Sequence, residues 1–129
     1  MNYKEKLEEL YLDEEEILSE LVDRSKSLIG ISRESGEIIF KVQMEKLNDH
    51  QKIILFMLGA CFLTDLGRRE NKEVTNQELS LFLDKRTEQI GSRLSELRKQ
   101  KKVKSTGTGK NILIPRNVVE DIADINELI

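Results

Sequence analysis

Residues 74–115 read VTNQELSLFLDKRTEQIGSRLSELRKQKKVKSTGTGKNILIP, and this stretch decides the fold. Thr75 and Glu78 have the spacing of a capping box, in which each side chain satisfies a backbone N–H group of the other residue. Val74 and Leu79 have the spacing of the hydrophobic staple that accompanies such a cap. The pattern predicts a helix that starts at Thr75 and stops before a turn at residues 84–86.

A basic amphipathic helix is expected next, over residues 87–101, with Thr87 as its cap. At about 100° per residue, three apolar side chains share one face, which must point inward. They are Ile90, Leu94 and Leu97. The opposite face is polar and charged. Gly91 lies between these faces, and we expect it to let the preceding helix pack closely.

A strand pair is expected over residues 103–115. Residues 107–109 supply two glycines to a flexible tip, and the apolar residues 112–114 form the return strand. A glycine-containing tip is also found in phosphate-binding loops. This one lacks the Gly-Lys-Ser/Thr ending and the strand-to-helix context of such loops, so we reject that interpretation.

This order of elements resembles the winged helix-turn-helix family of DNA-binding proteins, in particular the small archaeal and bacterial transcriptional regulators. The resemblance covers about a third of the chain and rests on a pattern of residue types. It implies a mainly α fold with small β elements, and a second helix that enters the major groove. We expect a winged helix domain over residues 48–129 and an N-terminal helical and hairpin extension over residues 1–47.

The resemblance also implies sequence-specific binding of double-stranded DNA in transcriptional control. The N-terminal half of the second helix meets base edges in such proteins. The candidate base contacts are Glu88, Gln89, Ser92 and Arg93, whose side chains can pair with bases. The candidate contacts to the DNA backbone are Lys85, Arg86, Lys99, Lys101, Lys102, Lys104 and Lys110. The alternative is a solvated charged helix face, which Glu88 and Glu96 favour because they repel phosphate.

Charge is segregated along the chain although the formal net charge is only −3. Residues 85–116 hold ten Lys or Arg against two acids, whereas residues 1–50 hold seven against thirteen. Residues 117–129 hold four acids and no basic residue. Such segregation creates a positive field on one face that the whole-chain charge conceals.

The acidic N-terminal segment, residues 1–28, carries an apolar stripe at helical spacing. Asp13 and Glu16 have capping-box form, so two helices broken near Leu12 are an alternative to a single helix. The stripe must be buried, either within the chain or against a second copy as a coiled-coil-like homodimer. The heptad pattern that starts at Leu7 is imperfect because it meets Glu14. Both alternatives remain open.

The remaining segments predict a hairpin over residues 28–42, with Gly36 in its loop, and a buried central helix over residues 48–66. Asn48 or Asp49 caps this helix and Gly67 ends it. Gly59 within it lets a neighbour approach closely. A short acidic helix is expected after Pro115, packed on the N-terminal helix or on a partner.

No residues suit catalysis, a metal or a cofactor. His50 is the only histidine and has no cysteine or acid at ligand or triad spacing, and Cys61 stands alone. We therefore expect no enzyme activity.

A lone cysteine, an acidic N-terminus unlike a signal peptide and no apolar run of roughly 20 residues predict a cytoplasmic protein without a membrane partner. The alternative function is a winged-helix interaction module of a larger assembly, docking through its acidic N-terminal helix.

Overall fold

The computed structural model describes all of residues 1–129. Helix accounts for 54% of the chain, so the fold is mainly α with small antiparallel sheets, as expected. The helices are α1 (Tyr3–Glu8), α2 (Glu14–Ser25), α3 (Asp49–Asp65), α4 (Asn76–Leu83), α5 (Thr87–Lys99) and α6 (Val119–Asn126). The strands are β1 (Ile29–Ile31), β2 (Ile38–Phe40), β3 (Val74–Thr75), β4 (Val103–Gly107) and β5 (Lys110–Leu113). Two 3-10 turns are η1 (Met44–Lys46) and η2 (Pro115–Asn117). No helix is both long and apolar enough to cross a bilayer.

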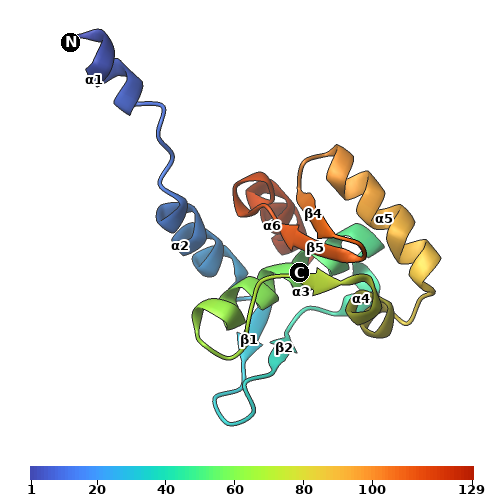
Figure 1. The fold of residues 1–129 in the computed structure, drawn as a ribbon. Helices are drawn as coiled ribbons and strands as arrows, with labels where there is room; N and C mark the ends of the chain where they lie inside the picture. The colour runs from blue at the N-terminus through green and yellow to red at the C-terminus, as the bar shows by residue number, and fades with distance from the viewer.

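The central element is α3, which contacts α4, α5, α6 and β5 (Figure 1). Ile53, Leu55 and Leu58 are all fully buried although they point in different directions around the helix axis. A helix that is apolar all round must be covered on all sides, and the other elements provide that cover. The predicted buried central helix is thus confirmed.

The ends of α3 lie where the sequence predicts them. Asn48 caps the helix: its side-chain oxygen accepts from the Gln51 N–H at 2.8 Å, and its own N–H donates to the Gln51 side chain at 2.9 Å. Gly67 follows the helix with a φ of +75°, a conformation that glycine adopts without strain. Both predictions are confirmed.

The predicted pair of helices forms as α4 and α5. Thr75 Oγ1 accepts from the Glu78 N–H at 3.0 Å, and Glu78 Oε1 accepts from the Thr75 N–H at 3.1 Å, which confirms the capping box. The apolar stripe of α5 is fully buried, also as predicted. Its members are Ile90, Leu94 and Leu97.

The predicted ends of α5 are wrong by one or two residues. Arg86 has an extended backbone and takes the cap position, so Thr87 is the first helical residue. Gln89 then accepts from the Arg86 N–H at 3.4 Å, in place of a cap by a threonine hydroxyl. At the other end Lys101 has a φ of +59°, which stops the helix at Lys99.

Two small antiparallel sheets complete the fold. The predicted hairpin forms from β1 and β2, with Gly36 at a φ of +73° in its loop. The predicted strand pair forms from β4 and β5, and β3 joins it on the β5 side to give the order β3-β5-β4. The register pairs Val103 with Leu113 and Val74 with Asn111, which places these residues on the inner face.

The N-terminal segment forms two helices, α1 and α2, rather than a single one, and the two parts differ in their surroundings. Helix α2 packs against α6 within the same chain, where Leu21 is fully buried. Asn126 of α6 donates to the Arg24 carbonyl oxygen and accepts from the Ser27 hydroxyl, both at 2.6 Å. Helix α1 has no buried residue and projects away from the rest of the molecule (Figure 1).

Two helical glycines have opposite surroundings. A Cβ atom at Gly59 would lie 2.0 Å from Cδ1 of Ile38, so this glycine lets β2 pack closely on α3, as expected. A Cβ atom at Gly91 would meet nothing within 4 Å. The expectation that Gly91 allows close packing of the preceding helix is therefore wrong, because no atom of α4 lies near this position.

We expect leucine to have opposite effects at these two glycines. Gly59→Leu should lower the free energy of unfolding by about 1–3 kcal/mol, because the side chain overpacks the contact with Ile38. Gly91→Leu should raise it by roughly 0.5–1 kcal/mol, because helix propensity improves in open space. Urea denaturation followed by circular dichroism measures both changes. Equal stability of Gly59→Leu and the natural chain would contradict the packing of β2 on α3.

Candidate nucleic-acid interface

One face of α5 is turned to solvent at the edge of the molecule (Figure 1). Burial of the stripe through Leu94 orients the helix, so the opposite side chains Glu88 and Ser92 are exposed. The Ser92 hydroxyl donates to the Glu88 carbonyl oxygen at 3.2 Å, within the same helix. The exposed face therefore offers a carboxylate and a hydroxyl group, with Lys99 further along it.

One flank of α5 is tied to the first turn of α3 by charged side chains. Arg93 donates from Nε to Oδ2 of Asp49 at 3.3 Å and from Nη1 to Oε1 of Glu96 at 3.3 Å. Lys85, from the turn before α5, donates to the same Asp49 oxygen at 2.9 Å. His50 Nε2 lies 2.6 Å from Glu96 Oε2, in a contact that does not have the geometry of a hydrogen bond.

The Asp49 carboxylate is the centre of this cluster, and its side chain is only 14% exposed. Burial by itself raises its pKa, but the hydrogen bonds and positive charges of Lys85 and Arg93 outweigh burial and hold the pKa below the ordinary value of 3.8. The charged carboxylate therefore fixes the turn and α5 against α3.

The other flank of α5 is tied to the strand pair by Asn111 of β5, which is 2% exposed. Its amide group donates to the Val74 carbonyl oxygen at 3.2 Å and to Asn76 Oδ1 at 2.8 Å. Its side-chain oxygen accepts from Arg98 of α5 at 3.3 Å. One buried side chain thus fixes β5 relative to β3, α4 and α5, and with it the position of the β4–β5 tip.

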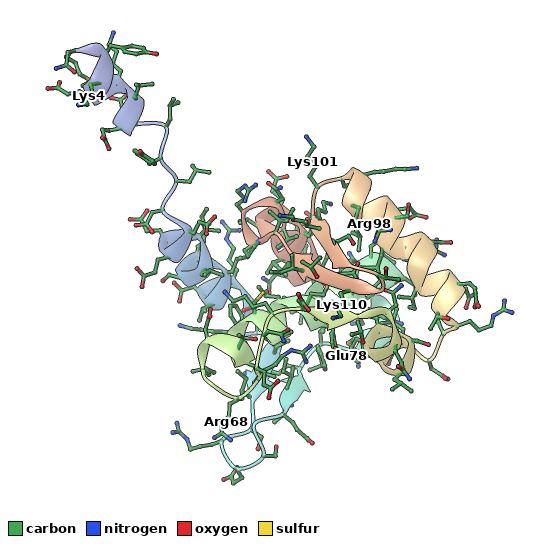
Figure 2. The ribbon with its side chains drawn as sticks, in the orientation of Figure 1. Lys4, Arg68, Glu78, Arg98, Lys101 and Lys110 are labelled. Carbon is green, nitrogen blue, oxygen red and sulfur yellow. The ribbon has the colours of Figure 1, made fainter.

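The predicted backbone-contact residues fall into two groups. Five are exposed and form no ion pair within the chain: Arg86, Lys99, Lys101, Lys104 and Lys110. Two are held by carboxylates, since Lys85 pairs with Asp49 at 2.9 Å and Lys102 with Asp121 at 2.8 Å. Of the five, Lys104 also lines a groove between the strand pair and α2. Figure 2 shows Lys101 at the end of α5, pointing away from the body of the molecule.

The four predicted base-contact residues do not share one environment. Glu88 and Ser92 lie on the exposed face, whereas Arg93 is half-buried on the flank beside α3. The Gln89 side chain turns back toward the Arg86 N–H. The roles of Asp49 and Asn111 in positioning this surface were not predicted from the sequence. An asparagine at an inward position of an apolar strand is the one signal that indicates Asn111.

The chain has no cluster of three or more His, Cys, Asp or Glu side chains arranged to hold a metal ion. Burial raises the pKa of the Cys61 thiol to about 11, so the thiol stays protonated at neutral pH. In comparisons with known proteins, no family model, curated protein or solved structure matches this chain.

The Asp49 cluster predicts a stability difference that depends on pH. Asp49→Asn should lower the free energy of unfolding by roughly 1–2 kcal/mol at pH 7, because hydrogen bonds to a charged group are lost from a partly screened site. The pKa of Asp49 is lower in the folded state than its ordinary 3.8. The stabilisation of the folded state by the Asp49 carboxylate is therefore complete above the ordinary pKa of 3.8, and it disappears as the pH falls through the lower folded-state pKa.

Urea denaturation of both proteins between pH 7 and pH 2 tests this expectation. Asp65→Asn is the matched control, since Asp65 is 51% exposed and pairs only with Lys72. It should change stability by less than roughly 0.5 kcal/mol. A constant difference between Asp49→Asn and the natural chain down to the lowest pH would contradict the ionised cluster.

Proposed function

We propose that this chain is a cytoplasmic winged helix-turn-helix protein that binds specific double-stranded DNA sequences and regulates transcription. The observation that carries the proposal is the exposed face of α5, which is fixed on both flanks and bordered by unpaired cations. The order of α3, β3, α4, α5 and the β4–β5 hairpin supports the winged helix assignment, with α5 as the recognition helix and the hairpin as the wing.

Helix α5 has suitable dimensions for the major groove. Its 13 residues give a length of about 20 Å, and a helix is roughly as wide as the groove. In the proposed complex Glu88 accepts from a cytosine amino group, and Ser92 bonds to either kind of base edge. Arg93 extends from the flank toward a guanine, held in direction by Asp49 and Glu96.

Four of the five unpaired cations lie where phosphates border such a helix. Arg86 precedes α5, Lys99 is its last residue, Lys101 follows it, and Lys110 begins the return strand of the wing. Lys101 holds a backbone conformation with a φ of +59°, which costs roughly 1–2 kcal/mol for a residue other than glycine. A lysine at a position that favours glycine supports a role for its charge.

A second candidate function is a winged-helix interaction module that assembles with another protein through its acidic N-terminus. The exposed apolar side chains of α1, including Tyr3 at 77% exposure, favour it. The two functions differ in their response to duplex DNA, since only the first requires binding that weakens with salt.

DNA binding and its salt dependence test the proposed function directly. With Arg86, Lys99, Lys101 and Lys110 on phosphates, the logarithm of the association constant should fall against the logarithm of salt concentration with a slope of about −4 per DNA-binding domain. Titration of a random duplex pool, measured by fluorescence anisotropy from 50 to roughly 200 mM salt, gives this slope. A protein that binds no duplex at the lowest salt concentration would favour the interaction module.

Three substitutions should separate base contacts from phosphate contacts. Ser92→Ala should weaken binding to the preferred sequence by about 1–3 kcal/mol and leave non-specific binding unchanged. Lys110→Ala should weaken binding to all sequences and make the salt slope shallower by about one unit. Lys101→Gly should have the same effect on binding while the folded protein becomes roughly 0.5–1 kcal/mol more stable, because the strained backbone is relieved.

Lys101→Gly is the most informative of the three, because weaker DNA binding together with higher stability cannot result from unfolding. Leu94→Ala is the control for unfolding, with an expected loss of about 2–5 kcal/mol of stability. If Ser92→Ala leaves discrimination between sequences intact in a protein that binds DNA, α5 is not the recognition helix.

A further inference from the structure

We propose that two copies of this chain form a dimer by exchanging their N-terminal arms, residues 1–12. In this dimer the arm of each copy lies in a groove of the other copy, between α2 and the β4–β5 strand pair. The inference concerns assembly and does not depend on DNA binding.

The arm is an unpartnered amphipathic segment. Tyr3 and Leu7 lie one turn apart on α1, and Leu10 and Tyr11 follow at helical spacing just after its end. Leu10 and Tyr11 are 75% and 78% exposed, and α1 buries nothing in its own chain. A helix of six residues is unstable alone in water, so the arm requires a surface that covers these apolar side chains.

A groove on the body of the molecule has the matching character. It has a volume of about 280 Å³, and apolar side chains line it from α2 and from β5 onward, among them Leu18, Ile112 and Pro115. Three cations border it from separate segments: Lys72, Lys104 and Arg116. None of them pairs with an acid across the groove, because the one ion pair among them joins Lys72 to Asp65.

Charge favours the arm as the occupant of this groove. Residues 1–16 hold seven acids and two lysines, so the arm and its connection to α2 are negative where the groove is positive. The apolar side chains of the arm fit the apolar lining, and its acids remain at the edges near the three cations. An apolar centre with a charged rim is the usual composition of a specific protein interface.

Geometry favours a second copy as the source of the arm. The groove begins at Glu14, the residue where the arm joins α2, and the arm then leads away from its own body (Figure 1). Docking in its own groove would require the chain to reverse direction within residues 9–13. When two copies meet groove to groove, each arm starts beside the other copy's groove and keeps its outward direction. This arrangement is two-fold symmetric, and therefore closed.

Light scattering on the full chain and on three variants tests the exchange. The full chain should be a dimer, and deletion of residues 1–12 should give a monomer that remains folded, because α1 buries nothing in its own chain. Leu10→Asp in the arm and Lys104→Glu at the groove should each weaken the dimer at least tenfold. Lys46→Glu, an exposed substitution outside the arm and the groove, is the matched control and should leave it intact. A full chain that stays monomeric at roughly 100 µM, where a micromolar dimer would be populated, overturns the proposal.

Disulfide trapping distinguishes exchange from docking within one chain. A chain carrying both Leu10→Cys and Lys104→Cys should form covalent dimers on mild oxidation. The chain also carries Cys61→Ser, because the native Cys61 lines the same groove and would compete for the thiol at position 10. An intrachain disulfide would show that the arm closes on its own groove, and absence of any cross-link would show that the groove does not bind the arm. Either result overturns the proposed exchange.

Discussion

The rest of the structure depends on the requirement to cover α3 on every side. Its side chains are apolar around the whole circumference, and Ile53, Leu55 and Leu58 are fully buried in different directions. One helix face can be covered by a single neighbour, but a helix that is apolar all round needs several. Helices α4, α5 and α6, strand β5 and the β1–β2 hairpin all contribute to that cover. The hairpin and α2 also contribute side chains to this core, and only α1 lies outside it.

The orientation of the exposed face of α5 is set by side-chain contacts between α5 and its neighbours. Asp49 at the start of α3 holds Lys85 and Arg93, and Asn111 in β5 holds Arg98. These contacts keep α5 from rotating, so its outward face is fixed before any ligand arrives. A surface that is already rigid loses less conformational entropy on binding, which favours a recognition role for α5. The same contacts reduce the number of free cations, so the positive field around α5 is smaller than the residue count in that segment indicates.

Local sequence patterns predicted most of the fold and only part of the candidate site. The Thr75–Glu78 capping box and the apolar circumference of α3 are short-range features, and both predictions are confirmed. Gly59 and Gly91 are indistinguishable by such patterns, because their difference lies in whether Ile38 is opposite. Asp49 is separated from Lys85 by 36 residues and from Arg93 by 44. Pairing over such distances depends on how helices cross, and no spacing rule in one sequence reveals it.

The packing of α2 against α6 also has a consequence for the order of folding. Ser27 and Asn126 are 99 residues apart, so their contact closes a loop of nearly the whole chain. Loop closure becomes more costly with length, and such contacts form after the local ones. The segment from α3 to β5 contains the shorter-range contacts and can assemble first, with α2 and α6 joining later. During synthesis, α2 therefore waits for α6 to emerge before its Leu21 side chain can be buried between them. Until then α2 exposes the apolar face that α6 later covers, and transiently exposed apolar surface promotes aggregation.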